Sequence, residues 1–245
     1  MLARSENAAI SSLFISIFCL FYRIDLAEAE RSRRSDYRSF NDFFTRALKP
    51  GARTINGPLC SPADGTVAAL GRIENDTVIQ SKQHNYSLKA LLAAEDTAAF
   101  EGGSFITIYL APHNYHRVHV PVTAELHSTT YVPGDLFSVN LRTADQLPDL
   151  FARNERLVCR FRTGSGPMAL VMVGAMLVAG IRPVWANRPY KPRLQVSSEM
   201  KMTFSCGAEL GQFEMGSTVI LVFQEAIDFS VSPGDIVTMG QSLRA

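Results

Sequence analysis

The chain has 245 residues, of which 47% are hydrophobic, and its 24 basic and 23 acidic side chains leave a formal net charge of +1. This size and composition are typical of one large globular domain, or of a domain with an appendage, built around a full hydrophobic core. The balanced charge, without aromatic residues interleaved among basic ones, argues against a nucleic-acid partner. The four cysteines are widely spaced and form no Cys-x-x-Cys pair, which argues against a disulfide framework or a zinc ribbon and favours a reducing compartment.

The first element in chain order is an apolar run over residues 8–22, AAISSLFISIFCLFY. It is shorter than the about 20 residues that a membrane-spanning helix needs, so three interpretations compete. It could be a signal peptide, because Arg4 precedes it and Ala27-Glu28-Ala29 follows it. It could also be a buried core helix, or an anchor that lies in the membrane surface. An arginine cluster beside the run favours an anionic membrane face by about 1 kcal/mol per residue, although a solvated linker explains it equally well: Arg31, Arg33, Arg34 and Arg38.

Residues 38–48 carry phenylalanines at helical spacing, which predicts a short amphipathic helix that ends at Pro50-Gly51. Residues 87–94 predict a second short helix. Segments rich in β-branched or apolar residues, separated by turn sequences, predict strands over residues 104–110, 156–162, 168–178 and 218–223. Because helices and strands do not alternate regularly, the predicted fold class is α+β, with a β-rich core and helices at the N-terminal end.

Three of the five histidines, His113, His116 and His119, lie within seven positions. A metal site is one interpretation, but residues three apart on a strand point to opposite faces, and no carboxylate or cysteine lies within the cluster. No metal is therefore expected. General acid–base catalysis suits the histidine pKa better, whereas any single histidine here could instead be a hydrogen-bonded core residue.

Two further residues could join such a histidine. Asp64 precedes Gly65 in a turn, where aspartate most often bonds nearby backbone amides, yet its carboxylate could also orient an imidazole. Ser217 follows Gly216 at the start of an apolar run, where Gly-Ser-Thr could be a simple turn into a buried strand. Together, Asp64, His119 and Ser217 could form a hydroxyl-activating triad. The Gly-x-Ser-x-Gly pattern of the nucleophile elbow is absent, so that form of hydrolase is unsupported.

Six segments, in the same order, resemble the bacterial membrane-type phosphatidylserine decarboxylases. They span roughly residues 37–240 and are together highly specific, although each one alone is weak: Ser61-Pro62-Ala63-Asp64-Gly65, His84-Asn85-Tyr86-Ser87-Leu88, Tyr115-His116-Arg117-Val118-His119, residues 131–140 (YVPGDLFSVN), residues 150–156 (LFARNER) and Gly216-Ser217-Thr218.

The resemblance implies a carboxy-lyase that is made as a proenzyme. His119 would take the Ser217 proton while Asp64 holds its imidazole, and the Ser217 oxygen would attack the Gly216 carbonyl. The cut would leave a β chain of residues 1–216 and an α chain of residues 217–245, and would turn Ser217 into a covalent pyruvoyl cofactor. Phosphatidylserine would form a Schiff base with this group, lose CO₂ and leave as phosphatidylethanolamine. His116 and His119 are the candidates for proton transfer in that reaction.

The resemblance also implies how the chain is divided into parts, where the protein is located and which partners it has. Residues 1–50 would be a helical membrane-associating segment, and residues 51–245 the decarboxylase domain. The protein would be peripheral, on the cytoplasmic side of the cell membrane. Its expected partners are phosphatidylserine, the membrane surface, the α chain with the β chain, and a second copy in a homodimer. The remaining alternatives are a serine hydrolase that does not cleave itself, a membrane-anchored binding module without activity, and a histidine–metal enzyme.

Overall fold

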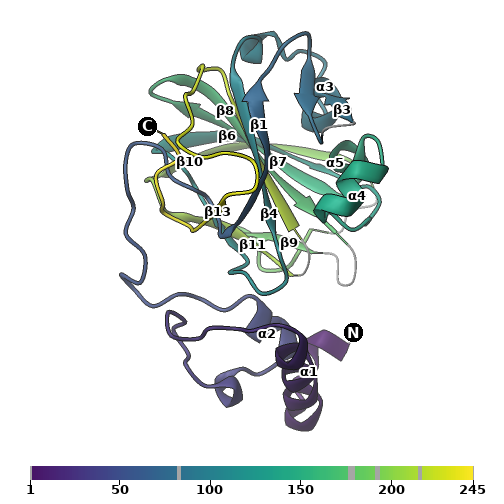
Figure 1. Ribbon diagram of the computed structural model, residues 1–245, viewed down its shortest axis with the longest axis vertical. Helices are drawn as coiled ribbons and strands as arrows, with labels where there is room; N and C mark the ends of the chain where they lie inside the picture. Colours follow the sequence, from purple (N-terminus) through teal and green to yellow (C-terminus); the bar gives the residue numbers. More distant parts are fainter. Residues whose placement is uncertain (1, 82–83, 176–179, 191–193, 215–216, 245) are drawn as a thin grey trace.

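The computed structural model describes residues 2–81, 84–175, 180–190, 194–214 and 217–244. The first 50 residues form a small helical unit that lies at one end of the molecule (Figure 1). It contains the short 3₁₀ segments η1 (Leu2–Arg4) and η2 (Arg34–Asp36) and the helices α1 (Ala8–Phe21) and α2 (Phe40–Phe44). The Asn7 side chain caps α1 by accepting from two backbone amides, and the Ser39 side chain caps α2. One face of α1 packs with α2 around Ile15, Tyr37, Phe40, Phe43 and Phe44.

The rest of the chain is built on antiparallel sheets. The largest has eight strands in the order β10-β6-β7-β8-β12-β4-β1-β13. Its strands, in chain order, are β1 (Gly65–Arg72), β4 (Ser104–Leu110), β6 (Ala124–Val132), β7 (Arg156–Thr163), β8 (Gly166–Gly174), β10 (Val196–Phe204), β12 (Ser217–Phe223) and β13 (Ile236–Val237).

Smaller elements cover both faces of this sheet. A three-stranded sheet has the order β5-β11-β9, and β2 pairs with β3. The bounds of these elements and of the remaining helices are β2 (Thr77–Ile79), β3 (Asn85–Ser87), α3 (Leu88–Leu92), η3 (Ala98–Phe100), β5 (Arg117–His119), α4 (Leu141–Gln146), α5 (Leu150–Arg153), β9 (Ile181–Pro183) and β11 (Glu209–Phe213).

Strand β12 shows how the two faces divide. Val219 and Leu221 pack into a core shared with the three-stranded sheet, and Ile220 and Val222 pack into a second core covered by α3 and α5. All seven residues of β12 are buried. Because both faces are covered, the strand reads as a continuous apolar run and not as an alternating one.

The observed elements confirm the predicted α+β class. The helix expected over 87–94 is α3, and the strand expected over 168–178 is β8, although residues 176–179 lie outside the described part of the chain. The helix expected over 38–48 is only five residues long, but its phenylalanines are buried as predicted. The interpretation of residues 8–22 as a buried core helix is wrong, because Leu20 and Phe21 are 82% and 78% exposed.

The eight-stranded and three-stranded sheets pack face to face and are called the sandwich below. The helical unit contacts the sandwich through residues 113–119, the segment that carries three of the histidines. The Phe44 ring stacks on His116 with ring centroids 4.0 Å apart. The buried Arg46 guanidinium donates to the carbonyl oxygens of His113 and Asn114 at 3.0 and 3.1 Å. Arg117 donates from Nε to the Thr45 carbonyl at 3.0 Å. The end of α2 therefore fixes the backbone of the segment that carries the candidate catalytic histidines.

We expect Phe44→Ala to lower the free energy of unfolding by about 3–5 kcal/mol, because it opens a cavity where a fully buried ring meets His116. Urea unfolding of the Ser217→Ala protein, which should remain one polypeptide, measures the effect. Phe21→Ala is the matched control, since that ring is exposed, and its effect should stay within about 0.5 kcal/mol. Equal effects of the two changes would show that Phe44 does not join the two units.

Candidate active site

Ser217 begins strand β12, in register with Leu110 of β4 and Gly174 of β8. Its side chain is fully buried, and among the described residues its Oγ has no hydrogen-bond partner. Strand alternation puts Ser217 on the face of Val219 and Leu221, which is the core shared with the three-stranded sheet. A buried hydroxyl without a partner lowers the stability of the fold by about 1–3 kcal/mol. Stability therefore does not explain a serine at position 217, whereas a chemical role would. Gly216, the other half of the predicted cleavage site, lies outside the described residues.

His116 is fully buried and lies on the same side of its extended segment as Val118, which packs in that same core. Its Nδ1 lies 2.8 Å from the Asn114 carbonyl oxygen. That nitrogen must donate, so Nε2 is the acceptor in the neutral ring, and Nε2 has no partner among the described residues. Burial lowers the pKa of His116 to about 3, partly offset by the Asn114 carbonyl. His116 is therefore a neutral imidazole with an open lone pair.

His119 lines a cleft of about 270 Å³ together with Tyr115, Gly207 and Glu209. Its Nδ1 donates to the Gly207 carbonyl at 2.8 Å, and its Nε2 accepts from the Tyr115 hydroxyl at 2.9 Å. Burial lowers the pKa of His119, while the Gly207 carbonyl, Glu209 and Asp64 act to raise it. Gly207 has φ +80°, a backbone conformation that glycine adopts without strain.

Asp64 lies in a neighbouring cleft of about 180 Å³ that shares Tyr115 and Arg53 with the His119 cleft. One carboxylate oxygen accepts from Arg53 Nη2 at 3.0 Å, and the other accepts from the Met239 backbone N–H at 2.8 Å. The carboxylate thus binds a backbone amide, as aspartate in a turn commonly does, and its charge acts to raise the pKa of His119.

One expected contact is not formed. The sequence interpretation has Asp64 holding the His119 imidazole, but here the two carboxylate oxygens bind Arg53 and Met239, and His119 Nδ1 binds Gly207. The physical reason is that a guanidinium is a stronger carboxylate partner than a neutral imidazole, whose N–H a backbone carbonyl satisfies. The structure therefore brings Asp64 and His119 into adjoining clefts, whereas the side chains of His116 and Ser217 are fully buried.

Four groups that contact His119 or Asp64, or act on the pKa of His119, were not identified from the sequence: Tyr115, Arg53, Glu209 and the Gly207 carbonyl. Tyr115 could have been identified, because it begins the segment Tyr115-His116-Arg117-Val118-His119 and carries a hydroxyl that can bind an imidazole. The other three reach the site only through tertiary contacts. Arg53 also pairs with Glu28 of the N-terminal unit, and Glu209 pairs with Arg117 at 2.9 Å.

The N-terminal unit also reaches the segment just before Ser217. Arg4 donates from Nη2 to the carboxylate of Glu214, whose side chain is only 5% exposed. Strands β4 and β12 meet at Leu110 and Ser217, and the histidine segment follows directly after Leu110. The segment just before β12 and the histidine segment thus both contact the N-terminal unit, which lies at one end of the molecule (Figure 1).

The arrangement offers a buried hydroxyl, two neutral imidazoles and a carboxylate that favours the imidazolium form of one of them. These are the parts for proton transfer from a hydroxyl and for attack on a nearby carbonyl. Among the residues that the structure describes, no three histidine, cysteine or acidic side chains gather in a way that could hold a metal ion.

Comparison with known proteins gives consistent matches over nearly the whole chain. The family model described as phosphatidylserine decarboxylase matches residues 40–245. A phosphatidylserine decarboxylase proenzyme from Shewanella pealeana is 45% identical over 258 residues, covering 98% of this chain and 90% of the relative. A proenzyme of the same name from Alteromonas mediterranea is 44% identical, covering 99% of this chain and 79% of the relative.

Proposed function

We propose that this chain, which belongs to the phosphatidylserine decarboxylase family of carboxy-lyases, cleaves itself between Gly216 and Ser217 and acts through a pyruvoyl group formed at residue 217. The observation that carries the proposal is the Ser217 hydroxyl, which is buried where a central strand begins and has no hydrogen-bond partner in the described part of the chain. The reaction we propose is the conversion of phosphatidylserine into phosphatidylethanolamine and CO₂.

The self-cleavage we propose uses groups of the chain itself. The Ser217 Oγ loses its proton to an imidazole and attacks the Gly216 carbonyl carbon, and the peptide C–N bond breaks to give an ester. β-Elimination releases the carboxylate of residues 1–216 and leaves dehydroalanine at residue 217. Its imine tautomer then adds water and releases ammonia, which gives the carbonyl of the pyruvoyl group. Oxyanion and ester formation both suit a closed, water-poor site, where charge interactions are strong.

We assign the base to His119 and a second proton-transfer role to His116. A base is most effective when its pKa is near the operating pH. Asp64 and Glu209 raise the pKa of His119 against the effect of burial, whereas burial lowers that of His116 to about 3. Tyr115 donates to the same Nε2 that would take the Ser217 proton, so its hydroxyl must turn away, or relay the proton, when the base acts.

Two observations support a pyruvoyl group at residue 217: the space next to this residue and a buried imidazole. Residue 217 lies beside Gly174, which has no side chain to crowd it, and the buried His116 Nε2 has no hydrogen-bond partner among the described residues. A carbonyl at this position supplies an electron sink for the decarboxylation of an amine-bearing substrate. The surrounding residues exclude water from it and supply neutral imidazole for proton transfer.

The products of the cut should stay together. All seven residues of β12 pair with β4 on one side and with β8 on the other, so the α chain would contribute a central strand to the large sheet. Separating the two chains would expose fully buried side chains of both cores.

Intact-mass spectrometry of the purified protein tests the proposal. Two polypeptides are expected, residues 1–216 and residues 217–245, with the second lacking a free amino terminus. Borohydride in the presence of phosphatidylserine should add the lipid to the second polypeptide. A single intact chain with decarboxylase activity would contradict the proposal, and an intact chain with esterase activity would favour a serine hydrolase.

We further propose that helix α1 docks on the cytoplasmic face of the membrane, where the lipid substrate resides. Four large apolar side chains at helical spacing face solvent on α1: Leu13, Ile17, Leu20 and Phe21, which are 44–82% exposed. No described helix is long and apolar enough to cross a bilayer. A partly apolar helix of this kind suits a position in the plane of the membrane interface.

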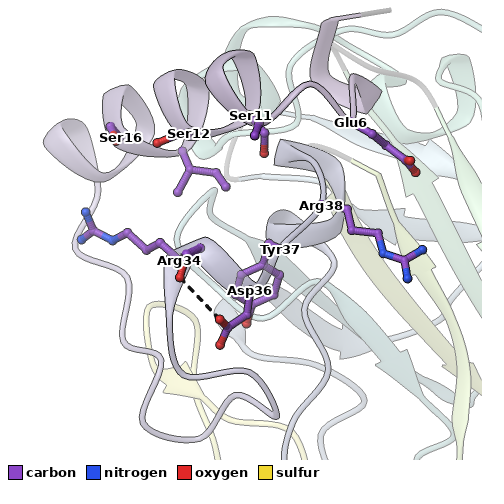
Figure 2. A pocket seen from close by; sticks show the side chains of 11 residues that line it. Glu6, Ser11, Ser12, Ser16, Arg34, Asp36, Tyr37 and Arg38 are labelled. Carbon is purple, nitrogen blue, oxygen red and sulfur yellow. Dashed lines mark hydrogen bonds between the residues drawn. The ribbon is translucent and has the colours of Figure 1, made fainter.

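Polar side chains lie on α1 and on residues 34–38 beside it. They would lie among the lipid head groups if the exposed apolar side chains of α1 entered the membrane. A pocket of about 430 Å³ lies between α1 and residues 34–38. Figure 2 shows Ser11, Ser12 and Ser16 along the helix, with Arg34 and Arg38 extending on either side. The Ser11 hydroxyl is buried and has no partner within the described part of the chain. Hydroxyl and guanidinium donors of this kind suit phosphodiester oxygens.

We expect Leu20→Ser with Phe21→Ser to weaken binding to anionic vesicles at least about 10-fold, because two exposed apolar groups that would enter the interface are lost. Vesicle co-sedimentation measures the change. Leu194→Ser is the control, since Leu194 is 77% exposed but lies on the sandwich and not on α1. Unchanged vesicle binding by the α1 variant would contradict this orientation.

A further inference from the structure

Two cysteines that are distant in sequence meet beside His119. The sulfur atoms of Cys60 and Cys206 are 3.4 Å apart, across 146 residues of chain. Both cysteines contact the same carbonyl: the Cys60 backbone N–H donates to the Pro121 oxygen at 2.9 Å, and the Cys206 thiol donates to it at 3.2 Å. The pair therefore ties together three segments at one point.

These segments supply the contacts that hold His119. The Pro62 carbonyl, two residues after Cys60, accepts from the His119 backbone N–H at 2.8 Å. The Gly207 carbonyl, one residue after Cys206, accepts from His119 Nδ1 at 2.8 Å. Any covalent change at the cysteine pair therefore acts on both partners of the histidine.

We propose that Cys60 and Cys206 form a reversible disulfide that locks the two loops holding His119. A disulfide needs the sulfurs to approach from 3.4 Å to about 2.05 Å, a movement that two loop segments can supply. The other two cysteines are not in this cluster: Cys19 lies in α1 and Cys159 in β7. The pair is thus a modification site for a small disulfide oxidant such as oxidised glutathione.

The two thiols have different roles in this exchange. Cys206 is partly exposed, so its thiolate attacks the small disulfide, releases one thiol and forms a mixed disulfide. The Cys60 thiolate then attacks the Cys206 sulfur and releases the second thiol, which balances two protein thiols against one oxidant disulfide. Burial, reinforced by the contact with Cys206, raises the pKa of the Cys60 thiol to about 12. This keeps Cys60 protonated in the reduced pair, so Cys206 is the thiol that reacts first.

Oxidation of the purified, self-cleaved protein with oxidised glutathione tests the proposal. Residues 1–216 should lose the mass of two hydrogens, reactive thiols should fall from four to two, and peptide mapping should join Cys60 to Cys206. The thermal midpoint should rise on the order of 10 °C, because the closed loop is long. Dithiothreitol should reverse all of these changes.

Matched variants separate this pair from general thiol chemistry. Cys19→Ser and Cys159→Ser should leave disulfide formation unchanged, whereas Cys60→Ser should stop at a glutathione adduct on Cys206. Four persistent thiols, or a disulfide that involves another cysteine, would overturn the proposal. Any effect of the disulfide on catalysis rests on the role proposed for His119. The mass and thermal measurements do not depend on that role. A failure of the disulfide proposal can therefore be told apart from a failure of the proposed function.

Discussion

Ser217→Ala should leave the protein as one uncleaved polypeptide of 27.0 kDa with no decarboxylase activity. The change removes the oxygen that attacks the Gly216 carbonyl, and no other group at that position can become a carbonyl. Because the hydroxyl is buried without a partner, its removal should not destabilise the fold. Denaturing gel electrophoresis, intact mass and a CO₂-release assay measure the three expected results.

Thr218→Val is the matched control for that experiment. Thr218 is the next residue on β12, and its hydroxyl is equally buried and unpartnered among the described residues, but it faces the opposite core. Valine keeps the shape and removes the hydroxyl. This variant should still cleave, and loss of cleavage in both variants would show that the strand, and not the Ser217 oxygen, is what the reaction needs.

His119→Ala should slow self-cleavage about 10²–10⁴-fold, which is the usual contribution of a general base. The time course of chain conversion on a denaturing gel measures the rate. His127→Ala, on the partly exposed β6 strand, should cleave at the normal rate. If His116→Ala blocks cleavage and His119→Ala does not, the base is instead His116, whose buried Nε2 has no partner among the described residues.

The pH dependence of cleavage provides a second test of the same base. A base works when neutral, and the pKa of His119 lies below its ordinary value because of burial. The rate should therefore stay level as the pH falls through about 6.5 and decline only at lower pH. Asp64→Asn removes a charge that favours the imidazolium, so it should move this decline to still lower pH. A shift toward higher pH would contradict the assigned interaction.

The candidate chemistry could be proposed from the sequence because the residues that would carry it lie in short, ordered segments. The β-rich core followed from apolar runs such as residues 218–223, since a strand covered on both faces must be apolar at every position. The candidate residues Asp64, His116, His119 and Ser217 followed from their motifs and from the resemblance that those motifs carry.

The partners of these residues were decided only by the tertiary structure. Local sequence cannot show that Arg53 and the Met239 amide would take both Asp64 oxygens, or that Gly207 would take His119 Nδ1. Tertiary packing also gave the two histidines different surroundings, because His116 stacks on Phe44 of the N-terminal unit and His119 binds Tyr115 and Gly207. The contact between Cys60 and Cys206 crosses 146 residues. Such long-range contacts depend on how the sheets pack, whereas the candidate residues could be named from short motifs and from the resemblance that those motifs carry.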